Sequence, residues 1–201
     1  MKTVRKTSTG PDKADSLRDR IVQAAAKLFS EGGYDSLSMR RVAQEAECSQ
    51  MAMYRYFANK EALIQHICNE LYARFAKRMN AEIDAEQQPW DKMRRFLAAV
   101  VRFAVAYPDH YALIFLVRHA DQAVVTEREK LGREFISGLR ELVRQLMPPK
   151  TPDDAVDEVL RRMLSCLHGT AALLIAHPKA YGLNRQRAVE DVEAVLLRLI
   201  G

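Results

Sequence analysis

Cysteine is scarce in this chain of 201 residues, and its three copies lie far apart. Cys48, Cys68 and Cys166 form no Cys-x-x-Cys pair, so their spacing argues against a disulfide framework and against a zinc site. The five histidines also lack the spacing of metal ligands. No set of Ser, His and Asp that would form a hydrolase triad stands out. The sequence therefore predicts no metal, no cofactor and no catalytic residues.

Long hydrophobic runs are missing as well. The longest apolar tracts, FLAAVV and MLSCLHGTAALLIA, are too short or too polar to cross a hydrocarbon layer about 30 Å thick. The opening stretch MKTVRKTSTGPDKADS is polar and basic, and it lacks the apolar segment of a secretory signal. We therefore expect residues 1–14 to form a flexible basic arm, and we expect the chain to lie in the cytoplasm without membrane contact.

The excess of positive charge is small but unevenly placed. Lys and Arg total 31 against 26 Asp and Glu, which gives a formal charge of +5. Residues 1–60 carry 11 basic and 7 acidic side chains, whereas residues 61–201 carry 20 and 19. Because a basic segment attracts phosphate groups, the first third of the chain is the candidate for contact with nucleic acid.

Strand-like alternation is nearly absent, whereas apolar residues recur every three or four positions. This pattern predicts an all-α chain of about nine helices. Pro89 and Pro108 stand where new helices begin, because proline fits the first turn of a helix. We expect two domains: a small helix-turn-helix domain over residues 15–60 and a larger helical domain over residues 61–201.

Residues 38–63, SMRRVAQEAECSQMAMYRYFANKEAL, place two very short helices back to back. Ser38 and Ser49 stand at expected helix N-caps, and Asn59 precedes a longer helix. Helices this short bury little surface alone, so they need the preceding helix, which begins near Leu17, behind them. Such a three-helix unit is a helix-turn-helix, whose second short helix can enter the DNA major groove, about 12 Å wide.

The second short helix should have one buried and one exposed face. The spacing of Met53 and Phe57 predicts that both side chains point into the core. The remaining side chains then point outward and are of the kinds that contact base edges and phosphates: Gln50, Met51, Tyr54 and Arg55. A solvated face without function is the alternative, above all for Met51, since methionine packs in many environments.

Residues 17–66 resemble the DNA-binding domain of the tetracycline-repressor (TetR) family of bacterial transcriptional regulators. The resemblance rests on the stretch IVQAAAKLFSEGGYDSLSMRRVAQEAECSQMAMYRYFANKEALI. It follows the family pattern AA-x-x-LF-x-x-x-G-[YF], then [TS]-[TM]-R-x-[LIV]-A-x-x-A-G-V-S, then Y-x-[HY]-F and [NS]-K-E-x-L. One departure is Glu47, where the family usually has glycine. If Glu47 takes a left-handed backbone, it costs about 1 kcal/mol relative to glycine.

The resemblance implies a function and residue roles. It implies a regulator, most often a repressor, that binds palindromic double-stranded DNA as a homodimer and is released by a small molecule. It places phosphate contacts at Ser38, Arg40, Tyr54 and Lys60, and base contacts at Gln50, Met51 and Arg55, with Ser49 at the start of the recognition helix.

The last two helices are the candidates for the dimer interface. Each carries an apolar stripe, and two such helices from each subunit could form a four-helix interface, as the resemblance implies. An internal core stripe is the alternative, and both can hold at once. The residues of the two stripes that we expect at the interface are Val156, Leu160, Met163, Leu167, Val192, Leu196 and Leu199.

The middle helices concentrate aromatic residues in the region that the TetR family uses as a ligand cavity. The segment YPDHYALIF together with LHGTAALLIA also resembles the Trp-His-Gly subclass of regulatory domains, with Leu167 in place of the Trp. The candidate ligand residues are Phe103, Tyr107, Tyr111, Phe115, Arg118 and His168. Their types favour a largely apolar effector, with ordinary core packing as the alternative for each.

Two other functions are compatible with parts of the sequence. A helical enzyme or small-molecule scavenger with a structural N-terminal unit would explain the aromatic residues but not the basic first third. An architectural DNA-binding protein without a ligand would explain the basic first third but not the aromatic residues.

Overall fold

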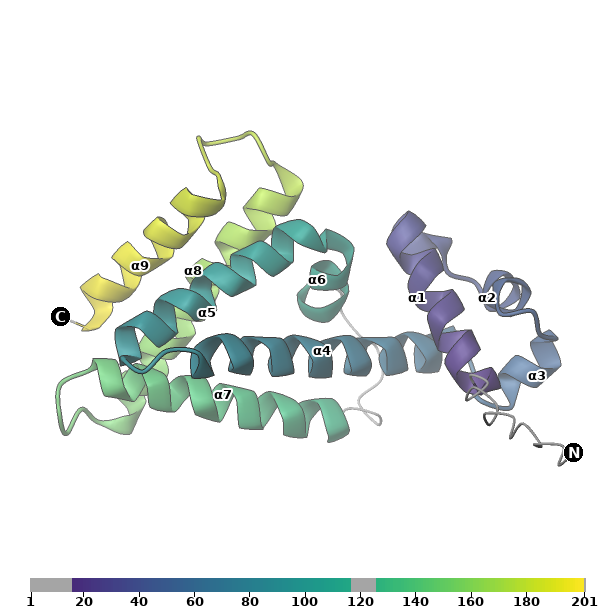
Figure 1. Cartoon of the computed structure of the whole chain (residues 1–201), viewed down its shortest axis with the longest axis horizontal. Coiled ribbons are helices and arrows are strands. Elements are labelled where there is room, and N and C mark those ends of the chain that lie inside the picture. The colour runs from purple at the N-terminus through teal and green to yellow at the C-terminus, as the bar shows by residue number, and fades with distance from the viewer. Residues whose placement is uncertain (1–15, 117–125, 201) are drawn as a thin grey trace, which may run out of the picture. The chain divides into compact units, whose positions relative to one another are not determined.

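The regular secondary structure of the described residues is helical. A computed structural model describes residues 16–116 and 126–200, and within these ranges it contains nine α-helices and no strand (Figure 1). The prediction of an all-α chain with an N-terminal helix-turn-helix is confirmed. The helices are α1 (Leu17–Ser36), α2 (Met39–Glu45), α3 (Gln50–Tyr54), α4 (Lys60–Asp84), α5 (Pro89–Ala106), α6 (Pro108–Phe115), α7 (Thr126–Leu146), α8 (Asp153–Ala176) and α9 (Arg185–Ile200).

The chain divides into two compact units between Leu63 and Ile64. The first unit contains α1, α2, α3 and the first residues of α4. The second contains the rest of α4 and α5 to α9. Helix α4 therefore begins in one unit and continues in the other.

The start of the first unit is fixed by local hydrogen bonds. The Ser16 hydroxyl accepts a hydrogen bond from the Asp19 backbone N–H at 3.2 Å, and the Asp19 carboxylate accepts one from the Ser16 N–H, which makes a capping box. Helix α1 is interrupted at Gly32 and Gly33, where φ of Gly33 is +64°. A last turn then runs to Ser36, whose hydroxyl donates to the Leu28 carbonyl at 2.6 Å.

The core of the first unit joins three helices through small and apolar side chains. Helix α1 packs against α2, and α2 packs against α3. Ala43 is buried on α2, so a small residue lies where these short helices pack closely. The other buried side chains of this core include Ile21, Ala25, Leu28, Phe29, Val42, Met53, Phe57 and Leu63.

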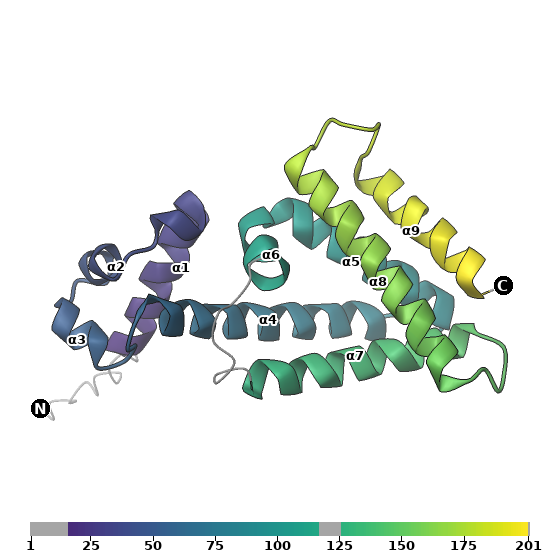
Figure 2. The ribbon, with the colours of Figure 1, turned by 180° about the vertical axis from the view of Figure 1, so that it is seen from behind.

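The second unit is a bundle built around α5 and α8. Helix α8 packs against α5, α7 and α9, and α5 also packs against α6, α7 and α9. Figure 2 shows α5, α8 and α9 running beside one another, with α7 along α4. Pro89 and Pro108 occupy the first turns of α5 and α6, as predicted. Pro152 is the N-cap of α8.

Helix α8 is the one helix of residues 16–116 and 126–200 that is long and apolar enough to cross a membrane by length and composition alone. One of its faces is buried in the bundle by seven side chains: Val156, Val159, Leu160, Met163, Leu167, Ala171 and Leu174. The packing is that of a core helix of a globular domain.

Candidate DNA interface and effector cavity

The turn between α2 and α3 is closed by backbone hydrogen bonds. The Cys48 N–H donates to the Ala43 carbonyl at 2.9 Å, and the Glu47 N–H donates to the Gln44 carbonyl at 3.2 Å. This pair of bonds is the Schellman arrangement, which needs a left-handed residue directly after the C-cap. Glu47 is that residue, with φ of +52°. The left-handed backbone considered from the sequence is therefore present, in a residue that carries a side chain.

Serine caps set where α2 and α3 begin. The Ser38 hydroxyl accepts a hydrogen bond from the Arg41 N–H at 3.2 Å, and the Ser49 hydroxyl accepts one from the Ala52 N–H at 3.1 Å. The Asn59 side chain does the same for α4, since its Oδ1 accepts from the Ala62 N–H at 2.7 Å. These predicted caps make the two short helices possible, because each satisfies a backbone donor that the helix cannot.

Helix α3 presents the predicted two faces. Met53 is 0% exposed and Phe57 is 4% exposed, so both belong to the core. Met51 is 80% exposed and Tyr54 is 50% exposed. Gln50 and Arg55 are exposed as well. The outward face therefore combines an amide, a thioether, a phenol and a guanidinium, which suits contact with base edges and phosphates.

The other predicted DNA contacts flank this face along the chain. Ser38 and Arg40 are exposed at the start of α2. Lys60 is half-buried: its ammonium lies 4.2 Å from the centre of the Tyr34 ring and donates to the Tyr34 carbonyl at 3.2 Å. Tyr56 is exposed too and was missed by the sequence reasoning, although the Tyr-x-Tyr-Phe pattern contains it. Tyr34 thus fixes the position of the Lys60 ammonium.

In the second unit, aromatic rings from α4, α5, α6 and α7 pack together. Phe75 lies 5.1 Å from Phe103 and 5.1 Å from Phe115, measured between ring centres. Tyr111 lies 4.9 Å from Phe115. The ring centre of Tyr107 lies 5.6 Å from that of Phe103, but Tyr107 is 46% exposed, so it lies at the edge of the cluster. The structure brings four of the six predicted ligand residues into this cluster; His168 contacts it from α8, and Arg118 lies outside the described residues.

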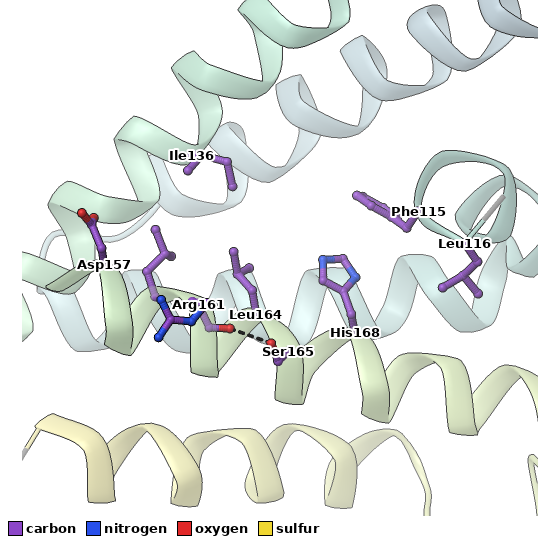
Figure 3. A pocket seen from close by; sticks show the side chains of 9 residues that line it. Phe115, Leu116, Ile136, Asp157, Arg161, Leu164, Ser165 and His168 are labelled. Carbon is purple, nitrogen blue, oxygen red and sulfur yellow. Dashed lines mark hydrogen bonds between the residues drawn. The ribbon is translucent and has the colours of Figure 1, made fainter. Parts of the chain in front are cut away.

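A cavity of about 550 Å³ borders the aromatic cluster (Figure 3). Of the predicted ligand residues, Phe115 and His168 line it, whereas Phe103 and Tyr111 are buried. Much of the wall belongs to one face of α8, and of the residues predicted at the dimer interface only Leu160 lies in it. The lining residues are Phe115, Leu116, Ile136, Asp157, Leu160, Arg161, Leu164, Ser165 and His168. Most of the wall is apolar, as expected for a small-molecule site.

The polar side chains of the wall differ in how they are paired. Asp157 accepts a hydrogen bond from Arg140 at 2.5 Å, and the Ser165 hydroxyl donates to the Arg161 carbonyl at 2.9 Å (Figure 3). The Tyr111 hydroxyl lies 2.5 Å from Nδ1 of His168. Burial raises the pKa of Tyr111 and lowers the pKa of His168, so both groups are uncharged at neutral pH.

Residues predicted at the dimer interface are mostly core residues of this chain. Leu199 is partly buried, and the other six are buried: Val156, Leu160, Met163, Leu167, Val192 and Leu196. These six residues therefore fit the alternative, in which the apolar stripes are part of the internal core. Dimerisation itself stays a prediction, and the large apolar side chains that α8 and α9 expose are Leu173, at 42%, and Leu197, at 53%.

The part of the chain that the structure describes contains no group of three or more His, Cys, Asp and Glu side chains that could hold a metal ion.

Two family models match the chain. The model described as bacterial regulatory proteins of the tetR family matches residues 21–67, and the model described as a tetracyclin repressor-like C-terminal domain matches residues 93–199. Among curated proteins, the HTH-type transcriptional repressor NicS of Pseudomonas putida is 27% identical over 111 residues, which are 55% of this chain and 52% of NicS. The match spans less than two thirds of each of the first curated relatives.

Solved structures share the fold over nearly the whole chain. A protein of unknown function from Rhodococcus sp. RHA1 has a TM-score of 0.79 and 20% identity, and the match covers 96% of this chain and 100% of that one. The transcriptional regulator FadR from Bacillus subtilis, solved in complex with stearoyl-CoA, has a TM-score of 0.68 and 15% identity, with 90% and 97% covered. At these identities the likeness concerns the fold.

Proposed function

The chain belongs to the TetR family of bacterial regulatory proteins, and from this premise we propose that it is a transcriptional repressor that binds a palindromic operator as a homodimer and is released by a small, largely apolar effector. The observation that carries the proposal is the exposed polar face of α3. Met53 and Phe57 are buried in the core and so keep this face turned outward. A regulator of this kind acts in the cytoplasm and without catalysis.

Each DNA contact has a physical role in this proposal. Gln50, Met51 and Arg55 read base edges in the major groove, since an amide and a guanidinium form paired hydrogen bonds with bases and a thioether contacts the thymine methyl group. Phosphates are held from the two sides of that helix, which fixes its register on the duplex. The phosphate contacts are Ser38, Arg40, Tyr54 and Lys60, with Ser49 at the N-terminus of α3.

The dimer follows from the small size of α3. A helix of five residues reads too few base pairs for useful specificity, so two copies must bind two half-sites. The faces of α8 and α9 that bear Leu173 and Leu197 are the proposed contact between the copies.

The effector site is the cavity beside the aromatic cluster. Its apolar wall supports an effector with a large apolar part, and FadR, a protein of the same fold, was solved in complex with stearoyl-CoA, which carries a hydrocarbon acyl chain. The pair His168–Gly169 supports membership of the Trp-His-Gly subclass, with Leu167 in place of the Trp. Helix α4 runs from the DNA-binding unit into the effector unit, so it is the continuous element through which the two sites are linked. The protein has one arrangement that binds DNA and one that does not. The effector can lower the affinity for DNA only to the extent that it binds the second arrangement more tightly than the first.

The experiment begins with selection of duplexes by the full-length protein from a random pool, followed by titration of the selected duplex at several salt concentrations. Lys60→Ala should weaken binding and lower the salt slope by about 0.9, because one phosphate contact is lost. Lys179→Ala removes an exposed lysine of the second unit and should leave both quantities unchanged. If no duplex is enriched, the chain is not a sequence-specific regulator, and a turnover screen for an enzyme becomes the next experiment.

A further inference from the structure

The hydrogen bond between Tyr111 and His168 determines which imidazole nitrogen carries hydrogen. Both groups are uncharged at neutral pH, so they hold one hydroxyl hydrogen and one imidazole hydrogen. Tyr111 is fully buried, and Nδ1 of His168 is its one hydrogen-bond partner among residues 16–116 and 126–200. The hydroxyl must therefore donate to Nδ1, because otherwise its hydrogen would be buried without an acceptor. The imidazole hydrogen is then on Nε2.

Nε2 of His168 is a hydrogen-bond donor that faces the cavity side of the aromatic cluster. Within the described ranges the imidazole makes no hydrogen bond other than the one to Tyr111. Figure 3 shows the ring rising from α8 toward the side of the cavity where Phe115 lies. The neighbouring side chains Phe115, Leu116 and Leu164 have no acceptor to offer, and the Ser165 hydroxyl donates to the Arg161 carbonyl and makes no hydrogen bond with the imidazole. A molecule in the cavity that carries an acceptor would satisfy this donor.

The charges on the wall indicate that this acceptor is uncharged. The cationic residue of the described wall, Arg161, lies seven residues from His168 on α8, or about 10 Å along the helix axis. Asp157 is also at that end of the cavity, where it pairs with Arg140. A carboxylate placed at His168 would face a neutral imidazole, apolar side chains and the Ser165 hydroxyl, with no cation beside it, and an unpaired charge in such surroundings is costly. A carbonyl oxygen needs only one donor.

We propose that the effector is an uncharged, largely apolar molecule whose carbonyl oxygen accepts a hydrogen bond from Nε2 of His168, while its hydrocarbon or aromatic part packs against Phe115, Leu164 and Ile136. This inference rests on the proposed function and names the chemistry of its effector. Tyr111 is a positioning residue in this site, because it fixes the imidazole hydrogen on Nε2 without touching the effector. A cavity of about 550 Å³ is large enough for such a molecule.

The test compares two probes of nearly equal shape, benzophenone and diphenylmethane, which differ by a carbonyl in place of a methylene. Their binding to the full-length chain without DNA is measured by titration calorimetry. In His168→Asn the amide oxygen can still accept from Tyr111, but no donor remains at the position of Nε2. The affinity for benzophenone should fall about tenfold in this variant, whereas that for diphenylmethane should change less than twofold, so the double-mutant comparison isolates the hydrogen bond.

A second variant separates recognition from folding. His168→Gln carries its amide N–H near the position of Nε2, so it should recover part of the preference for benzophenone. The inference is overturned if His168→Asn weakens both probes equally or if the wild-type chain binds neither. Operator binding is measured separately: a chain that binds its operator but lacks the carbonyl preference refutes this inference alone. A chain with the preference but without operator binding refutes the proposed function.

Discussion

Replacing Glu47 with glycine should stabilise the turn between α2 and α3. Glu47 has φ of +52°, and a left-handed backbone costs an L-residue about 1–2 kcal/mol. Glycine removes that cost but gives the unfolded chain more freedom, worth about 0.5–1 kcal/mol. Both hydrogen bonds that close the turn use backbone atoms of Ala43, Gln44, Glu47 and Cys48, so they survive the change. The expected net gain is about 0.5–1 kcal/mol.

Native-state hydrogen exchange measures this gain locally, because it reports the free energy of opening for individual amides. Exchange of the Ala46 and Cys48 amides should slow about two- to fivefold in Glu47→Gly. Glu47→Ala is the matched control: it removes the same charge but keeps the Cβ atom that makes the left-handed region costly. Exchange in the alanine variant should therefore stay within about twofold of that in the wild type.

If alanine slows exchange as much as glycine does, charge rather than backbone conformation limits the stability of the turn, and the left-handed cost at Glu47 is refuted. Faster exchange in Glu47→Gly would contradict it as well. Both variants remove a negative charge beside α3, so neither should weaken operator binding.

Three further predictions concern the second unit. Tyr111→Phe leaves Nδ1 of His168 without its donor and should lower the free energy of unfolding by about 1–3 kcal/mol, measured by urea unfolding. Burial lowers the pKa of His168 and of His110 below the ordinary 6.5, so the unfolded state takes up protons first and the free energy of unfolding should fall as pH drops below about 6.5. Urea unfolding between pH 8 and 5 should show a shallower fall in His168→Asn than in the wild type. Leu173→Asp should convert dimer to monomer in analytical ultracentrifugation, whereas Met51→Asp, which also places a carboxylate on an exposed apolar residue but in the first unit, should not.

Much of the fold could be predicted because the signals that delimit its helices are local. Ser38, Ser49 and Asn59 are caps in the sequence and in the structure, and Pro89 and Pro108 begin the helices that they were expected to begin. A cap or a proline acts on its own turn of helix, so neither needs knowledge of the tertiary structure.

The candidate sites were harder to predict because they depend on contacts between distant residues. Tyr111 and His168 are 57 positions apart, and no sequence pattern indicates that their side chains share a hydrogen bond. Leu167 and Val192 belong to apolar stripes, but periodicity reports only that a face is apolar and does not say whether it is covered by the same chain or by a second copy. The last turn of α1, which follows the break at Gly33, also depends on a contact outside itself, because the Ser36 hydroxyl donates to the Leu28 carbonyl.

Methylation interference on the selected operator tests the central proposal most directly, because methylation at N7 of guanine blocks the major groove alone. We expect interference in two half-sites about one helical turn apart, and we expect Arg55→Ala to remove it at one symmetric pair of positions, because a guanidinium pairs with O6 and N7 of guanine. Interference at a single site, or interference confined to methylation at N3 of adenine in the minor groove, would contradict the placement of α3 in the major groove by two copies of the chain.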